Sequence, residues 1–377
     1  MEIQTGACGY DRGSAENPLG TLDSPKASYR SAQMEIRLFN EEDRERWDQY
    51  VIRSDSTACY HLIGWKNVIE RSFGHKTYYL SARNTKGEVI GILPLVHLKS
   101  ILFGNYMVSL PYFNYGGICV DDEEGFDLLL KEAVDLATKG NAAHIELRHA
   151  QKGCNGLPAK VTKVSMRLEL PEKAEALWNA FPSKLRSQIR KPIKEGMYSK
   201  IGKREELESF YEVFSNNMRD LGTPVYAKKF FGNILEEFDE SAWICTVYTR
   251  ENKPAASGLL VGFKKRLEIP WASSLRIYNP YSPNMFLYWS CLEFACAKGY
   301  KVFDFGRSTP GEGTYKFKEQ WGAKPVQLYW HYWIRNGSSL PELNPDNPKY
   351  KRAIDIWKKL PVRLTRWIGP SLVKNLP

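Results

Sequence analysis

An internal repeat of secondary-structure patterns constrains the fold of this chain more than any other sequence feature. Each copy has three strand-like segments, a helix with one apolar face, a glycine that ends the helix, and a further strand. The first copy has its strands at 77–83, 88–99, 107–120 and 144–149 and its helix at 123–139. The second copy has its strands at 243–249, 255–263, 267–274 and 301–306 and its helix at 284–297. A repeated order of this kind predicts two copies of one folding unit.

The junction between the helix and the last strand also matches in the two copies. The segments "LATKGNAAHIELRH" and "FACAKGYKVFDFGRS" set Gly140 against Gly299 and Glu146 against Asp304. We therefore predict an α/β chain of the α+β kind, with two tandem domains that each contain a mixed, mostly antiparallel sheet flanked by helices. Two unrelated domains that share an order of elements are the alternative.

Composition sets the expected domain boundaries. Residues 1–33 are rich in Gly, Ser, Ala and Pro and have no apolar period, which predicts a disordered extension or a stretch added by an overlong start. The first domain is predicted at 34–165 and the second at 166–335. A basic amphipathic tail is predicted at 336–377.

The charge of the chain bears on its partners. The net charge of +10 favours polyanions such as RNA, nucleotide-linked sugars or anionic lipid. Bases are concentrated in the segment 184–204, where Glu195 is the one acid. The sequence shows no apolar run long enough to span a membrane and no secretory signal pattern, so we expect a cytoplasmic protein. The seven cysteines are odd in number and form no C-x-x-C pair, which indicates reduced thiols.

The segment "FDFGRSTPGEGTYKFKEQWG" follows the last predicted strand and fails the tests for common motifs. Gly306 and Gly311 have the spacing of a phosphate-binding P-loop, but Glu312 and Gly313 stand where Lys and Ser or Thr are required. The six histidines form no H-x-x-x-H or H-x-H pair, and no G-x-S-x-G elbow is present. We therefore predict neither a metal site nor a serine nucleophile.

What remains is a predicted active-site loop at 304–321. Strand ends of this kind often form ligand clefts in α/β sheets. The candidate residues of the loop are Asp304, Arg307, Tyr315, Lys318 and Trp321. Asp304 is a candidate for orienting or deprotonating a nucleophile, and an ion pair with Arg307 that holds the turn is the alternative. For the two aromatic residues, substrate binding and simple packing are both open.

Six segments carry a family resemblance. They read "HLIGWKNVIERSFGHKTYYL", "GILPLVHLKSILFG", "SLPYFNYGGI", "SKLRSQIRKPIKEG", "RDLGTPVYAKKFF" and "FDFGRSTPGEGTYKFKEQWGAKP". Between Met34 and Trp333 the chain resembles the FemAB-like family, and it is most similar to the branch associated with exosortase/PEP-CTERM and exopolysaccharide gene systems. The resemblance implies two GNAT-type (N-acyltransferase) domains. Better-understood relatives move an amino acid from aminoacyl-tRNA to an amine of a peptidoglycan precursor.

The resemblance also implies residue roles. The segment Tyr315-x-Phe317-Lys318 matches the family's Y-x-F-K, which implies that Lys318 stabilises charge on the transferring acyl group. Such a charge also suits the oxyanion of acyl transfer. The segment "KLRSQIRK" resembles the part that contacts the anionic portion of the acceptor in relatives. It implies substrate binding by Arg186, Arg190 and Lys191. A merely solvated basic helix face is the alternative.

The expected acyl donor follows from a missing loop. Acetyl-CoA-dependent GNAT enzymes use a [QR]-x-x-G-x-[GA] loop before a helix, and "RSFGHK" at 71–76 and "RDLGTP" at 219–224 do not complete it. We therefore expect no bound cofactor, and aminoacyl-tRNA rather than acyl-CoA as donor, with the basic segment contacting tRNA phosphates. In the tail, apolar side chains alternate with bases, as in a segment at the inner membrane face or one packed on the domains. These are Trp357, Leu360, Leu364, Trp367 and Ile368.

The sequence thus predicts an N-acyltransferase that acts on an amine of a peptidoglycan or exopolysaccharide precursor, which would be lipid-linked if the tail touches the membrane. It would be cytoplasmic, with peripheral contact at the cytoplasmic membrane. One alternative is an acyl-CoA-dependent N-acetyltransferase that acts on an amino sugar. The other is a non-catalytic module that binds RNA or polysaccharide.

Overall fold

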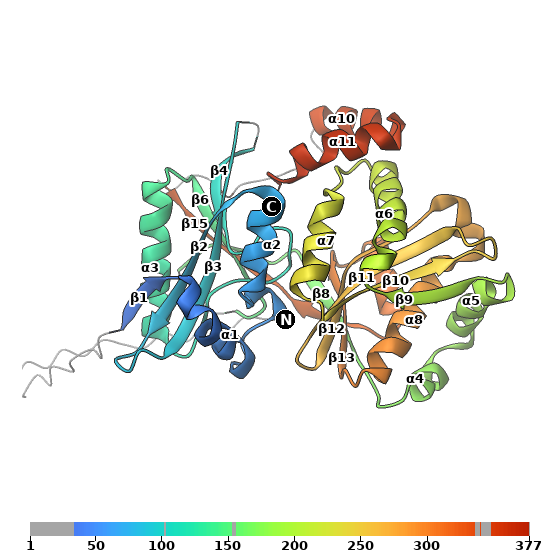
Figure 1. The fold of residues 1–377 in the computed structure, drawn as a ribbon, viewed down its shortest axis with the longest axis horizontal. Helices are drawn as coiled ribbons and strands as arrows, with labels where there is room; N and C mark the ends of the chain where they lie inside the picture. The colour runs from blue at the N-terminus through green and yellow to red at the C-terminus, as the bar shows by residue number, and fades with distance from the viewer. Residues whose placement is uncertain (1–33, 102, 153–155, 336–339, 341–347, 377) are drawn as a thin grey trace, which may run out of the picture.

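Two α/β units lie side by side in the computed structural model of the chain (Figure 1). The structure describes residues 34–101, 103–152, 156–335, 340 and 348–376. The predicted N-terminal extension, 1–33, lies outside the described residues. Each unit is built on one sheet with helices on both faces, as the repeat predicts.

The first sheet carries helices on both faces because its long central strand is apolar on both sides. Its strands, in spatial order, are β1 (Glu35–Leu38), β2 (Lys76–Arg83), β3 (Val89–Ser100), β4 (Gly104–Val108), β6 (His144–His149), β15 (Tyr329–Ile334) and β7 (Ala159–Lys160), with β5 (Cys119–Val120) beside β3. Leu93 and Leu95 of β3 pack under α3 (Glu123–Lys139). Ile92 and Val96 face α1 (Arg44–Arg53) and α2 (Gly64–Phe73). The predicted helix at 123–139 is confirmed, and Asp122 caps it by accepting from the Gly125 amide.

The second sheet has the same construction. Its strands, in spatial order, are β14 (Lys324–Gln327), β8 (Val164–Glu169), β13 (Val302–Ser308), β12 (Arg266–Ser274), β11 (Pro254–Phe263), β10 (Ala242–Tyr248) and β9 (Tyr198–Gly202). One face is covered by α4 (Ala174–Ala180), α5 (Ser183–Lys194) and α8 (Pro283–Ala297). The other face is covered by α6 (Leu207–Leu221) and α7 (Lys228–Glu237), and α7 lies toward the first unit, where it contacts α2 (Figure 1).

Within the described residues, each sheet contains one parallel strand pair among antiparallel neighbours. In the first sheet β4 runs parallel to β6 and pairs Val108 with Glu146. In the second sheet β12 runs parallel to β13 and pairs Glu268 with Asp304. In both sheets the parallel pairing ends at the acidic residue, so the predicted equivalence of Glu146 and Asp304 and the predicted mixed sheets are confirmed.

Strand β15 joins the first sheet although it follows the whole second unit in the sequence. It pairs with β6 and β7, and Figure 1 shows it as an orange-red strand among the strands of the first unit. The second domain predicted at 166–335 therefore contains a strand of the first sheet. A local apolar pattern specifies a strand, but the strand's neighbours depend on which sheet edge is open, and that is a property of the tertiary structure.

Two segments differ from the sequence prediction. The strand predicted at 107–120 ends at Val108, because Leu110 and Tyr112 have positive φ values of 69° and 75° that turn the chain. Its apolar residues are explained by burial at the junction of the two units. The loop predicted at 304–321 contains a short helix, α9 (Gly313–Glu319).

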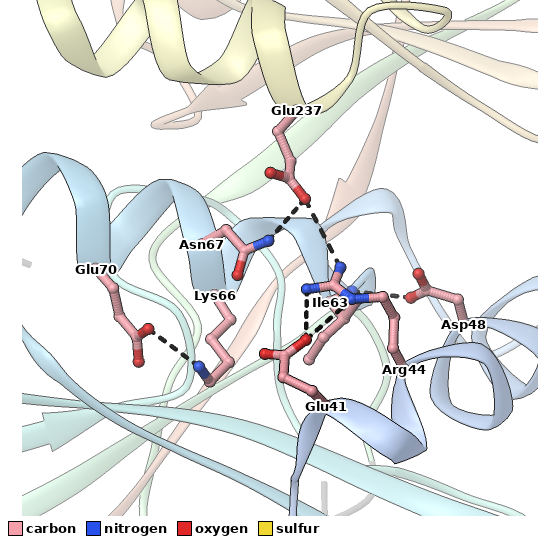
Figure 2. A network of polar contacts seen from close by, with 8 residues as sticks. All are labelled: Glu41, Arg44, Asp48, Ile63, Lys66, Asn67, Glu70 and Glu237. Atoms are coloured by element: carbon pink, nitrogen blue, oxygen red, sulfur yellow. Dashed lines mark hydrogen bonds and ion pairs between the residues drawn. The ribbon is translucent and has the colours of Figure 1, made fainter.

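The two units share one apolar core with a polar rim. Trp65 of α2 packs against Phe238 with ring centroids 4.6 Å apart. At the rim, Glu237 of α7 accepts a hydrogen bond of 2.9 Å from Asn67 and lies 3.8 Å from Arg44 (Figure 2). A Cβ on Gly64 would lie 2.8 Å from Glu237 Cγ, so only glycine allows this close approach. This interface fixes the second sheet beside the first unit.

Two further helices end the chain. Helices α10 (Pro348–Lys359) and α11 (Val362–Val373) lie on α6 at the top of Figure 1. Gly369 packs against Val225, and Arg366 Nε donates to Ser215 Oγ at 2.8 Å. Throughout the described residues, every helix is too short or too polar to span a bilayer.

Candidate active site

Asp304 lies at the centre of a buried hydrogen-bond network on β13. Its side chain has no exposed surface. Oδ1 accepts hydrogen bonds from Ser165 Oγ at 2.6 Å and from the Gly306 amide at 2.9 Å. Oδ2 accepts from Tyr115 Oη at 2.9 Å and from Arg167 Nε at 3.2 Å. Both carboxylate oxygens are therefore occupied by protein donors.

This geometry suits Asp304 to a positioning role rather than to proton transfer. The alternative ion pair with Arg307 is wrong, because the partner of Asp304 is Arg167 of β8. Gly306 has a φ of 76°, which turns its amide toward the carboxylate and starts an irregularity in the pairing of β13 with β8. The parallel pairing of β13 with β12 thus ends at Asp304, and the hydrogen bonds of Asp304 hold this point in place.

Glu268 of β12 is a second buried carboxyl group, directly opposite Asp304. It is 2% exposed, and Oε1 accepts a hydrogen bond of 3.2 Å from Asn114. Burial and the neighbouring Asp304 raise the pKa of Glu268 to about 8. Glu268 also lines a cavity of about 500 Å³. Of the two carboxyl groups it is therefore the one that can exchange a proton with a ligand near neutral pH.

Sequence reasoning missed Glu268. The available signal was an acidic residue inside the apolar strand "LEIPWASS". A carboxyl group in such a position is expected to be paired or to carry a raised pKa. The strand pairing that places it beside Asp304 was not readable from the sequence.

Lys318 of α9 is buried behind the irregular part of β13. It is 8% exposed, and Nζ donates to the carbonyl oxygens of Gly306 at 3.1 Å and Arg307 at 2.9 Å. Burial lowers its pKa to about 8, against the opposing effect of Asp304 and Glu268. An ammonium group has three N–H donors, so one remains beyond these two bonds. The structure brings the predicted lysine to the same strand end as the two carboxyl groups.

Arg307 extends from β13 to the junction with the first sheet. Its guanidinium lies 4.9 Å from the ring centre of Trp330 on β15, and Arg148 of β6 lies 4.3 Å from the same ring. Arg307 is exposed overall, but loss of hydration around its guanidinium and the charge of Arg148 lower its pKa to about 10. Arg148 donates to Glu146 and to the Phe113 carbonyl, while its Nη2 is buried without a partner. Two guanidinium groups on one indole ring are suited to an anionic group.

The aromatic candidates of the loop belong to the core of the second unit. Trp321 is 1% exposed and packs against Phe181 with ring centroids 5.5 Å apart. This burial leaves no surface for direct contact with a substrate, so packing is the better interpretation. Tyr315 is half-buried on α9 and packs against the same core.

The basic candidates lie on α5, at the side of the second unit away from the first (Figure 1). Arg186 donates to the carbonyl oxygens of Trp178 and Asn179 on α4. Arg190 lies 5.0 Å from the Trp178 ring, and Lys191 is exposed. The structure therefore places these three bases in a separate surface group. Their predicted role in acceptor binding stays a prediction.

Comparison with known proteins gives a family match to part of the second unit. Residues 182–319 match the family described as acetyltransferase (GNAT) domain. This segment is a GNAT-type domain. It contains Glu268, Asp304 and Lys318, so the cluster lies within the matched domain. A search of curated proteins finds no match to the sequence.

Solved structures show a similar fold over 80–88% of the chain. FemX is similar with a TM-score of 0.62 and 16% identity, over 80% of this chain and 98% of that protein. The C-terminal domain of an Agrobacterium fabrum protein described as a lysylphosphatidylglycerol synthetase is similar with a TM-score of 0.53 and 14% identity, over 88% and 96%. A tandem GNAT protein from the clavulanic acid biosynthesis pathway has a TM-score of 0.51 and 11% identity, over 82% and 100%.

These similarities confirm the predicted tandem GNAT fold of the FemAB-like type. Identities of this size establish the fold alone. The exosortase-associated branch stays a prediction.

Proposed function

We propose that this protein is an N-acyltransferase that transfers an aminoacyl or acyl group to an amine of a cell-envelope precursor. The observation that carries the proposal is the buried Glu268–Asp304 pair beside the buried Lys318, at the end of the one parallel strand pair in a GNAT-type sheet. Two carboxyl groups with different environments and a lysine of lowered pKa are typical of acid–base sites.

The proposed chemistry assigns a task to each group. The neutral amine attacks the ester or thioester carbonyl of the donor, and Glu268 takes the proton that the nitrogen loses as the new N–C bond forms. The Lys318 ammonium stabilises the oxyanion of the tetrahedral intermediate. The C–O or C–S bond to the leaving group then breaks, and the leaving group accepts a proton. Asp304 holds the strand end in place.

The proposed donor is aminoacyl-tRNA. In the second unit the helix that follows β12 is α8, and residues 276–281 precede it. Asn279 and Tyr281 occupy the positions at which a CoA-binding loop would carry Gly and Gly or Ala. The description of the matched family as an acetyltransferase domain favours acyl-CoA as the second candidate.

The proposed acceptor class is supported by the names of two structural neighbours. FemX and the lysylphosphatidylglycerol synthetase point to envelope components as substrates. Within that class, a peptidoglycan or exopolysaccharide precursor is our proposal for this chain.

A transfer assay tests this function. The full chain is incubated with radiolabelled aminoacyl-tRNA or radiolabelled acetyl-CoA, together with a membrane extract of its own cells as acceptor source. We expect label to move from tRNA into an envelope fraction. Transfer from acetyl-CoA alone would replace the proposed donor, and no transfer from either would favour a non-catalytic binding module.

We also propose that α10 and α11 contact the anionic inner membrane surface. Both helices contact α6, and Thr365, Gly369 and Val373 on the inner side of α11 are buried. Their outer side exposes 78% of Trp367 and 62% of Ile356. Exposed bases surround these apolar groups, namely Arg352, Lys359 and Arg363. An exposed indole among bases matches the chemistry of an anionic bilayer surface.

Replacement of Trp367 by serine is expected to lower vesicle binding by about tenfold or more, because the indole loses its apolar burial in the lipid. Flotation with phosphatidylcholine vesicles that contain phosphatidylglycerol measures the bound fraction. The control is Ile52→Ser, a 61% exposed apolar residue on α1 at the opposite side of the molecule. Equal vesicle binding by both variants would refute the contact. Vesicle binding that does not change with salt concentration or with phosphatidylglycerol content would also refute it.

A further inference from the structure

A cavity of about 500 Å³ lies between the two units. Residues 55–59 of the first unit form one side, and the ends of β11 and β12 form the other. Its volume falls in the range of small-molecule sites, about 300–1,000 Å³. The apolar part of the wall consists of Ala58, Cys59, Val261, Phe263 and Val302.

The charged side chains of the wall are Asp55, Lys264, Lys265, Arg266 and Glu268, so bases outnumber acids. The acid Glu268 and the base Arg266 do not pair with each other. Glu268 and Arg266 both line the cavity, and the charge of Arg266 acts on Glu268. Among the described residues, however, no ion pair within 4.0 Å joins the two side chains, and Arg266 Nε is buried without a hydrogen-bond partner. Opposite charges that share a cavity without contact leave room for a ligand group between them.

The remaining bases mark the edge of the cavity. Lys264 lies in the turn between β11 and β12. Its Nζ donates to the Ser54 carbonyl at 2.6 Å and to Thr57 Oγ1 at 3.2 Å, so these bonds connect the turn to the first unit. Lys265 is exposed beside it. These positive charges favour the approach of an anion, and the buried Glu268 favours an amine at the inner end.

We propose that this cavity is the acceptor site and that it takes a primary amine which also carries a phosphate or carboxylate group. The amine lies at Glu268, to which it yields its proton on acylation, and the anionic group lies at Arg266. This proposal rests on the proposed function. It adds a substrate class to that function, because an uncharged amine of the same size would leave the buried Arg266 Nε without a hydrogen-bond partner.

Binding to the full chain tests the proposal separately from catalysis. Isothermal titration calorimetry compares glucosamine 6-phosphate with glucosamine, and 4-aminobutyrate with butylamine, so that one pair tests phosphate and the other carboxylate. We expect at least one anionic amine to bind about tenfold or more tightly than its uncharged counterpart. We expect Arg266→Gln to abolish this preference. Arg204→Gln serves as the control, because Arg204 is an exposed arginine of the same unit outside the cavity wall.

A second variant tests the cavity without changing its charge. Ala58→Phe fills the space, and we expect it to weaken both anionic and uncharged amines while the unfolding temperature stays near that of the wild type. Preference for anionic amines that survives in both Arg266→Gln and Ala58→Phe would overturn the proposal, as would equal binding of charged and uncharged amines. Binding without any acyl transfer would instead retain the site and reject the proposed function. Acyl transfer that is unaffected by both variants would instead retain the proposed function and reject this cavity as the acceptor site.

Discussion

Replacement of Lys318 by alanine is expected to lower kcat by about 10²–10³-fold, because the oxyanion loses the charged donor that stabilises it. Lys318 Nζ is held by the carbonyl oxygens of Gly306 and Arg307, so its position is fixed before substrate binds. A preorganised charge in a buried site is worth more than one in water. Steady-state transfer kinetics with saturating donor measure the effect.

The matched control is Lys316→Ala, which removes an exposed lysine from the same helix. We expect this variant to keep kcat near the wild-type value. Lys318→Met keeps the length of the side chain and separates loss of charge from loss of packing. If Lys318→Met is as active as the wild type and unfolds at the same temperature, the assignment of Lys318 to the oxyanion is wrong.

Replacement of Glu268 by glutamine is expected to lower kcat/KM by about 10²–10⁴-fold, because the amine loses its proton acceptor. In the wild type Glu268, with a pKa of about 8, must be ionised and Lys318, also with a pKa of about 8, must be protonated. Activity should therefore rise toward pH 8 and fall above it. Glu268→Gln should lose the rising limb, and Lys318→Arg should lose the falling limb. A kcat/KM profile between pH 6 and 10 measures both.

The control for this substitution is Glu293→Gln on α8, another glutamate whose pKa is raised by burial. It lies outside the cluster, so the pH profile should not change. An acid limb that persists in Glu268→Gln would show that a different group takes the proton.

Glu268 also makes an expected contribution to stability. Its pKa rises from 4.5 to about 8 on folding, so between these values the folded state holds a proton that the unfolded state has released. The free energy of unfolding should therefore fall as pH increases from 4.5 to 8. In Glu268→Gln this part of the pH dependence should vanish, which denaturant unfolding at several pH values can measure. An unchanged pH dependence would mean that Glu268 titrates normally.

The different roles of the two neighbouring carboxyl groups follow from their surroundings. Asp304 accepts hydrogen bonds from Arg167, Tyr115 and other donors, which hold its carboxyl group in place. Glu268 is buried beside Asp304 and accepts a hydrogen bond from the Asn114 amide. Burial and the charge of Asp304 raise the pKa of Glu268, which favours its neutral form. The carboxyl group of Asp304 is thus held in place by its donors, while that of Glu268 remains available for proton transfer.

The sequence by itself determined the repeated units, the helix at 123–139 and most strands. It also determined the segment 304–321, which carries Asp304 and Lys318. Apolar periodicity and helix caps act over a few neighbouring residues, so they can be read locally. The resemblance of "TYKFK" to the family motif added the expected role of Lys318.

Only the tertiary structure decided which strands pair and which side chains meet. The insertion of β15 into the first sheet brings Trp330 into contact with both Arg148 and Arg307, from three distant parts of the chain. The parallel pairing of β12 with β13 puts Glu268 beside Asp304. Burial and neighbouring charge, which set the pKa values of these groups, exist only once the sheets are assembled, so no local pattern could reveal them.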